Sequence, residues 1–156
     1  MTLTSTPLSQ PTTTRAAAPR TPWRTIALVA GDALSFLVFA GVGRASHQEA
    51  TGLGAVAQIA ATAVPFALGW FVVSPWIGAF RRSLTEGVVP MLRRTELAWL
   101  CVWPAAMLLR WALVDRVTPI TFSKFASFAL VVLISNAVFL SLWRGVFAWA
   151  TRRVRW

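Results

Sequence analysis

Several residue types that build common functional sites are scarce in this chain of 156 residues. It has no tyrosine, one cysteine, one histidine and five acidic residues. One cysteine excludes a disulfide framework and a cysteine-rich metal site. One histidine excludes a bis-histidine haem site or a multi-histidine zinc site within one chain. No phosphate-binding loop occurs either, so we expect no cofactor, no metal and no catalysis.

Charged residues are also few, at 13%, whereas hydrophobic residues reach 56%. Soluble proteins have about 25% charged residues and about 45–50% hydrophobic residues. A globule of this size has no core large enough to bury that apolar fraction. The net charge of +10 comes from basic clusters between apolar runs. This pattern is typical of membrane proteins, in which basic clusters set the topology and attract anionic lipid head groups. The expected partner is the lipid bilayer, with a homo-oligomer or a membrane complex also open, and no nucleic acid.

Four windows have the length of about 17–25 mostly apolar residues that a bilayer requires. Backbone amides in hydrocarbon need internal partners, so the windows predict helices and an all-α, polytopic four-helix bundle. The expected helices cover about 23–43, 54–79, 97–114 and 122–149, within a transmembrane domain of residues 23–150. Residues 1–22 are rich in Thr, Ser and Pro and predict a disordered cytosolic tail, and residues 151–156 form a basic cytosolic end.

Prolines and tryptophans refine this picture. Pro65 and Pro75 fall in the second window, and a kink is expected near Ala61–Pro65. Tryptophans near window ends predict an aromatic belt at the membrane interfaces: Trp23, Trp76, Trp99, Trp143 and Trp149.

The distribution of Lys and Arg predicts the orientation. Eleven lie in the tail, the second connection and the C-terminal region, and three lie in the first and third connections. Cytoplasmic segments carry the excess of positive charge. We therefore expect a multi-pass protein of the inner cell membrane with both termini in the cytoplasm.

Asp32 is the most informative polar residue, because it lies about 12 Å along the first helix beyond Arg24. Such a carboxylate either couples proton or cation movement, or anchors a ligand, or fixes helix packing through an ion pair. Arg144 lies at roughly 9–12 Å depth from the same side. We predict an Asp32–Arg144 ion pair between the first and fourth helices, with Asn136 completing the hydrogen bonding.

Other polar residues have simpler interpretations. Arg110 lies near the outer end of the third helix, and its long side chain is expected to snorkel to the interface. Asn136 is expected to bond to a neighbouring helix. Arg44, Ser46 and His47 form an outer-side motif that we interpret as a solvated cap, since no oxyanion motif accompanies it.

Five fragments in order resemble the uncharacterised membrane family known as domain of unknown function 3054, over about residues 24–149. They are Gly31-Asp32-Ala33, Phe39 to His47, Pro65-Phe66 with Gly69-Trp70, Arg110-Trp111, and Trp143-Arg144. The resemblance implies a similar helix number and no assigned activity.

Two functions stay open at this point. The favoured one is an accessory or structural membrane subunit without catalysis, whose polar residues lock the packing. The alternative is a small dimeric transporter or proton-coupled carrier that uses Asp32.

Overall fold

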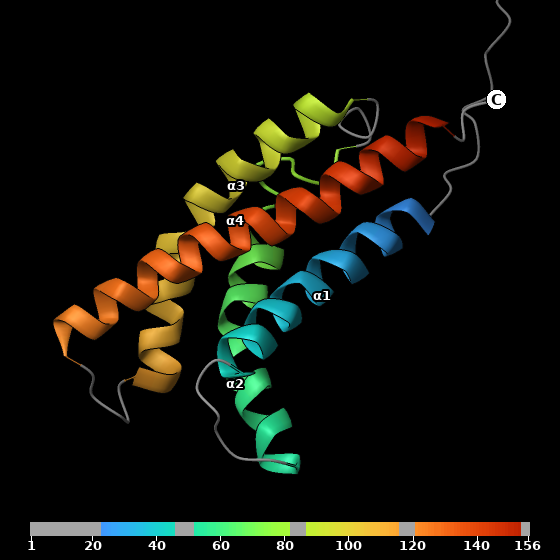
Figure 1. The fold of residues 1–156 in the computed structure, drawn as a ribbon. Coiled ribbons are helices and arrows are strands. Elements are labelled where there is room, and N and C mark those ends of the chain that lie inside the picture. The colour runs from blue at the N-terminus through green and yellow to red at the C-terminus, as the bar shows by residue number, and fades with distance from the viewer. Residues whose placement is uncertain (1–22, 46–51, 82–86, 116–120, 154–156) are drawn as a thin grey trace, which may run out of the picture.

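The computed structural model describes residues 23–45, 52–81, 87–115 and 121–153, and these residues form four α-helices and no strand. The helices are α1 (Trp23–Ala45), α2 (Leu53–Val73), α3 (Val88–Arg110) and α4 (Phe122–Arg153), with a π-helical turn, η2 (Trp111–Asp115), after α3 (Figure 1). Each helix is long and apolar enough to span a membrane. The predicted all-α, multi-pass class is confirmed. The predicted tail, residues 1–22, lies outside the described residues.

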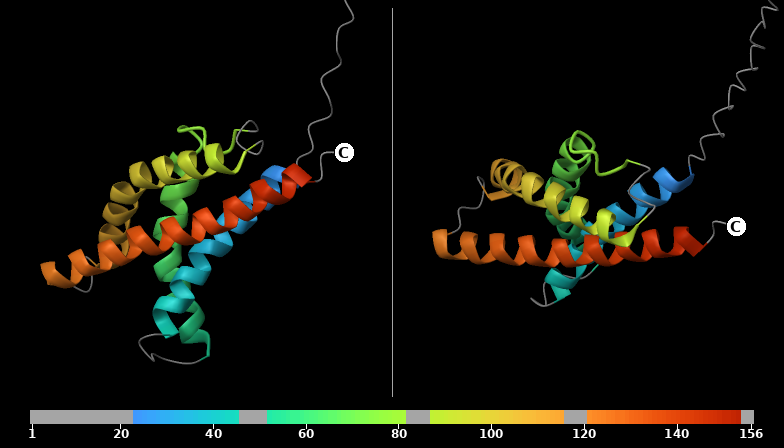
Figure 2. Two further views of the ribbon diagram at one scale, coloured as in Figure 1. Left: turned by 45° about the horizontal axis from the view of Figure 1, so that its top comes forward. Right: turned by 90° about the horizontal axis from the view of Figure 1, so that it is seen from above.

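The four helices form a closed ring of neighbours, in which α1 packs on α2, α2 on α3, α3 on α4, and α4 on α1. α1 and α4 lie side by side where α1 begins and α4 ends (Figures 1 and 2). At this basic end of the bundle, α3 begins and α2 ends as well. The opposite end carries Arg44, Arg110 and Lys124, whereas the basic end carries Arg24, Arg81, Arg93, Arg94, Arg152 and Arg153.

Two predicted helix bounds were wrong by six residues or more. The second helix ends at Val73 instead of residue 79, because Pro75 has no N–H to continue the helical hydrogen bonds and Gly78 takes a left-handed conformation with φ 80°. The third helix begins at Val88 instead of residue 97. Charged residues at 93, 94 and 96 interrupted the apolar run, yet Arg and Glu are good helix formers and the helix continues through them. Glu96 is half-buried and accepts a hydrogen bond from Ser141 of α4.

Helix length and bending also differ between the elements. α4 has 32 residues, or about 48 Å at 1.5 Å per residue, so it must tilt or extend beyond a hydrocarbon core of about 30 Å. α3 bends clearly along its length (Figure 2), and it contains Pro104, which removes a helical hydrogen bond. α2 continues through Pro65.

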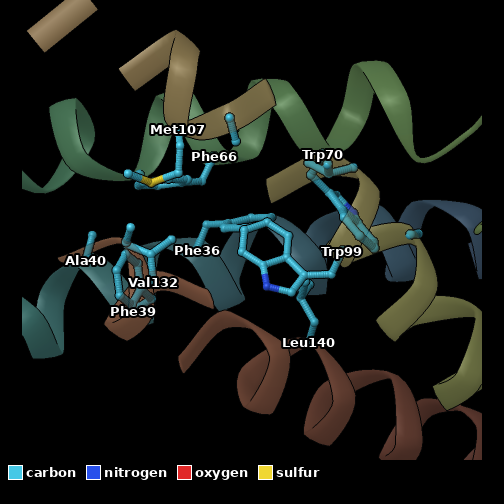
Figure 3. Packing of buried hydrophobic residues seen from close by; sticks show 14 of the residues in the cluster. Phe36, Phe39, Ala40, Phe66, Trp70, Trp99, Met107, Val132 and Leu140 are labelled. Carbon is cyan, nitrogen blue, oxygen red and sulfur yellow. The ribbon is translucent and has the colours of Figure 1, made fainter. Parts of the chain in front are cut away.

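Aromatic rings fill the centre of the bundle. Phe36, Trp70 and Trp99 are completely buried and lie close together (Figure 3), with ring centroids 5.8–6.4 Å apart. Trp99 was expected in the interfacial belt, but it donates its indole N–H to the carbonyl of Leu133 at 2.9 Å. That prediction was wrong because α3 begins nine residues earlier, which moves Trp99 away from the helix end. Trp76, by contrast, is 88% exposed.

Gly31 allows α1 and α4 to approach closely. A Cβ at this position would lie 1.8 Å from Cε2 of Trp143, so the indole ring rests directly on the α1 backbone. Gly31 is buried, and Trp143 also packs against Phe147, with ring centroids 5.8 Å apart. Small residues at helix interfaces permit this kind of backbone contact. The contact holds α1 and α4 together one residue away from Asp32.

Gly31→Ala should therefore lower the melting temperature in detergent, with a loss of about 1–3 kcal/mol from overpacking. Gly41→Ala is the matched control on the same helix, since a Cβ there meets nothing within 4 Å. It should leave the melting temperature unchanged or raise it, because alanine favours helix over glycine. Equal losses in both variants would contradict the proposed contact.

Candidate functional site

Asp32 of α1 and Arg144 of α4 meet in a bidentate ion pair. Arg144 Nε donates to Asp32 Oδ1 at 2.9 Å, and Arg144 Nη2 donates to Asp32 Oδ2 at 2.5 Å. Both side chains have 0% relative exposure. Each residue lies nine positions from the basic end of its helix, which is about 14 Å at 1.5 Å per residue. The predicted pair is confirmed, and matching depth is the reason that it forms.

Two more hydrogen bonds satisfy the remaining polar atoms of the pair. The indole Nε1 of Trp70 in α2 donates to Asp32 Oδ2 at 2.9 Å. Arg144 Nη1 donates to the backbone carbonyl of Ala79 at 2.7 Å. The Arg144 guanidinium also lies 5.0 Å from the ring centroid of Trp70 and 4.8 Å from that of Phe80, within the range of cation–π attraction. We call Asp32, Arg144, Trp70 and the Ala79 carbonyl the charge network.

The Ala79 carbonyl reaches Arg144 because of the turn that follows α2. Gly78 N–H donates to the Pro75 carbonyl at 2.9 Å, and Ala79 N–H donates to the Ser74 carbonyl at 3.0 Å. This pair of bonds, with Gly78 at φ 80°, has the pattern of a Schellman motif, in which glycine takes the left-handed conformation at no steric cost. The turn therefore brings the backbone after α2 into the charge network.

The charge network can exist in an apolar interior because it is complete. A buried ion pair is acceptable only when good geometry and extra hydrogen bonds offset the cost of removing both charges from water. Here Asp32 accepts three bonds, and Arg144 donates from all three of its side-chain nitrogen atoms. The arrangement is suited to fixing helix positions, since three helices and one turn must be in register for it to form.

Asn136 does not join the charge network, contrary to the prediction. Its Nδ2 donates to the Val132 carbonyl of its own helix at 3.1 Å, and Oδ1 has no hydrogen-bond partner among the described residues. A bond to the carbonyl four residues earlier is the usual alternative for a short polar side chain within a helix. The expectation of an interhelical bond was wrong, and Asn136 lies eight residues from Arg144, about 12 Å along α4, which is too far for its side chain to reach Asp32.

Arg110 contacts a neighbouring helix near the outer end of α3, and its expected snorkelling to the membrane interface stays a prediction. Its Nε and Nη1 atoms are buried, and its guanidinium lies 4.2 Å from the ring centroid of Phe128 in α4. The aromatic face attracts the cation and covers it on one side. Arg110 is therefore part of a second polar region, at the opposite end of the bundle from the charge network.

The outer-side motif is described only in part. Arg44 Nε donates to Gln58 Oε1 of α2 at 3.1 Å, whereas Ser46 and His47 lie outside the described residues. Arg44 and Arg110 line one pocket of about 300 Å³. The structure thus brings these two arginines to the same cavity, which the sequence did not predict.

Sequence reasoning missed several participants in these contacts. Trp70 was noted only as part of a family fragment, although an indole N–H in hydrocarbon needs an acceptor and Asp32 was available. Glu96 was placed outside the membrane, so its hydrogen bond with Ser141 was not considered. Nothing in the side-chain pattern could have indicated the Ala79 carbonyl, because a backbone acceptor depends on the turn that positions it.

Comparison with known proteins identifies the family. The family described as "Protein of unknown function (DUF3054)" matches residues 29–147, which covers the charge network and both pocket arginines. The resemblance inferred from the sequence is confirmed. No curated protein and no solved structure matches the chain.

The charge network generates a double-mutant prediction. Asp32→Asn and Arg144→Gln should each lower the unfolding free energy by about 3–5 kcal/mol, because each leaves one buried charge uncompensated, whereas the double variant should recover most of the loss. The measurement is thermal unfolding of the purified protein in detergent. Additive losses in the double variant would refute an energetic coupling between the two residues.

Proposed function

The chain belongs to this family of unknown function, and from that premise we propose that it is a non-catalytic accessory or structural subunit of the inner cell membrane. In this role the intramembrane charges hold the helices of a small bundle in one arrangement. The bundle then offers a rigid, apolar exterior to lipid and to a membrane partner.

The closure of the charge network is the observation that supports this proposal. A coupling carboxylate must release and regain a proton or cation, so it needs access to water during the cycle. Asp32 has 0% exposure and is held by three hydrogen bonds from two other helices. Withdrawing it would leave Arg144 buried without its counter-charge, at a cost of several kcal/mol.

The alternative function is a small dimeric transporter or proton-coupled carrier that uses Asp32. It requires the charge network to open in part of the cycle, and four helices would have to form a pathway together with a second copy. The two functions differ in what the neutral double variant should do. A packing role tolerates replacement of both charges, whereas a coupling role does not.

We expect proteoliposomes made with the wild-type protein or with the Asp32→Asn/Arg144→Gln double variant to be no leakier to protons than empty vesicles. Proton leakage is measured with an enclosed pH-sensitive dye under an imposed pH gradient. In native gels of solubilised membranes, the double variant should keep the same assembly as the wild type. Proton flux in the wild type that the double variant loses would replace the subunit proposal with the carrier.

The proposed orientation, with both termini in the cytoplasm, is supported by the basic residues. Arg144 leaves the group of eleven basic residues assigned to cytoplasmic segments, because it is buried in α4. The remaining Lys and Arg still favour the basic end by ten to three. Basic segments are retained on the cytoplasmic side during insertion.

Fusions test this orientation directly. Alkaline phosphatase joined after Glu49 should be active, since that connection is predicted to lie outside the cytoplasm, and the enzyme joined after Glu86 should be inactive. A reporter that is active only in the cytoplasm should give the opposite pattern at the same two positions. An inverted result with both reporters would reverse the proposed topology.

A further inference from the structure

Three arginines gather where α1 begins and α4 ends, at the basic end of the bundle. Arg24 is the second residue of α1, and Arg152 and Arg153 are the last two residues of α4. Arg152 and Arg153 are exposed, and Arg24 is half-buried. No ion pair joins any of them to a described carboxylate. We call these three residues the arginine patch.

The positive charge at this end is not cancelled by acidic side chains. The chain has five, which are Asp32, Glu49, Glu86, Glu96 and Asp115. By position in the sequence Glu49 and Asp115 belong to the opposite end, and Asp32 is used in the charge network. Glu96 accepts a hydrogen bond from Ser141, and residues 1–22 and 154–156 contain no Asp or Glu. Glu86 thus remains as the acidic side chain of the basic end, against ten arginines.

Two arginines of the patch are held on tryptophan rings. The Arg24 guanidinium lies 5.6 Å from the ring centroid of Trp23, and the Arg153 guanidinium lies 4.1 Å from that of Trp149. Both distances are within the range of cation–π attraction. Both tryptophans are exposed, and exposed tryptophans of membrane proteins sit at the level of the lipid head groups. The stacking therefore keeps two cations at that level.

The patch depends on the docking of α1 against α4. The two helices are antiparallel, and their contact continues from the charge network towards the basic end, where Leu28 of α1 is buried in one cluster with Phe147 and Ala148 of α4. The start of α1 and the end of α4 lie side by side (Figures 1 and 2). A partner that binds across the patch would therefore favour the same helix pairing as the Asp32–Arg144 ion pair.

The surroundings of the patch select a phospholipid. Exposed apolar side chains adjoin it on both helices, with Ile26 on α1 and Val146 on α4, so acyl chains can pack beside it. A guanidinium presents a planar fork of N–H donors that matches phosphate oxygen atoms. Several basic groups at one membrane surface attract anionic lipids, each adding to the binding.

We propose that the arginine patch binds the head groups of anionic phospholipids in the adjacent leaflet, and that the bound lipid stabilises the α1–α4 pairing. The proposal is independent of the subunit role, since the arginine patch and the charge network share no residue.

The test uses the full chain, purified and delipidated in a neutral detergent, with thermal unfolding and native mass spectrometry as readouts. The probes are phosphatidylglycerol, which is anionic, and phosphatidylcholine with the same acyl chains, which has no net charge. Phosphatidylglycerol should bind and raise the melting temperature more than phosphatidylcholine does. Added sodium chloride should reduce the difference, because salt screens charges at a surface.

Variants locate the binding. Arg24→Gln should weaken phosphatidylglycerol binding roughly fivefold, and the Arg152→Gln/Arg153→Gln double variant roughly twentyfold, as expected for the loss of one and two surface cations. Lys124→Gln is the control for the loss of one charge, because Lys124 is exposed at the opposite end; it should bind as the wild type does. If Arg24→Gln does not fold, the double variant carries the test, since both of its side chains are exposed.

Four results would overturn the proposal. They are equal stabilisation by the two lipids, unchanged phosphatidylglycerol binding in the double variant, equal weakening per charge in Lys124→Gln, and stabilisation by soluble polyglutamate without any by phosphatidylglycerol. The last result would assign the arginine patch to an acidic protein segment instead of a lipid.

Discussion

Asp32 and Arg144 are the two fully buried charges among the described residues. A mid-helix aspartate or arginine costs roughly 2.5–3.5 kcal/mol on insertion, which the apolar residues of the same helix can offset, but each charge lacks this counter-charge until α1 and α4 come together. The pair thus favours assembly: α1 and α4 are at opposite ends of the chain, and their docking closes the ring of four helices. Trp70 and the Ala79 carbonyl extend the same requirement to α2 and the turn after it, so the position of three helices depends on one set of hydrogen bonds.

The packing around the charge network follows from that constraint. Gly31 precedes Asp32, and Trp143 precedes Arg144, so the contact of the Trp143 indole with the α1 backbone lies beside the ion pair. Phe36, one turn after Asp32, packs against both Trp70 and Trp99. Lipid is as apolar as the core, so apolar contacts alone do not favour one helix arrangement over another. Close small-residue contacts and hydrogen bonds therefore have to specify the arrangement, and here they coincide at one depth.

How much the sequence could predict depended on the kind of information required. Window length and the absence of a globular composition predicted four spanning helices, and depth counted from the helix ends predicted the Asp32–Arg144 pair. These quantities are one-dimensional and can be counted along the chain.

The start of α3 was missed because apolar windows treat Glu96 as a break, although a hydrogen bond from Ser141 makes it acceptable inside. The direction of Asn136 was also missed, since a side-chain direction depends on which neighbour is nearest. The Ala79 carbonyl requires the Schellman turn at Gly78, a three-dimensional feature that no side-chain pattern contains.

The arginines of this protein differ by what neutralises or covers them, and that difference separates their roles. Arg144 has a carboxylate, a carbonyl and two aromatic faces around it, so each of its three side-chain nitrogen atoms donates a hydrogen bond within the chain. Arg110 has an aromatic face on one side and a cavity of about 300 Å³ on the other, and Arg44 lines the same cavity. A saturated arginine specifies structure, because any change in its partners costs free energy without a compensating bond.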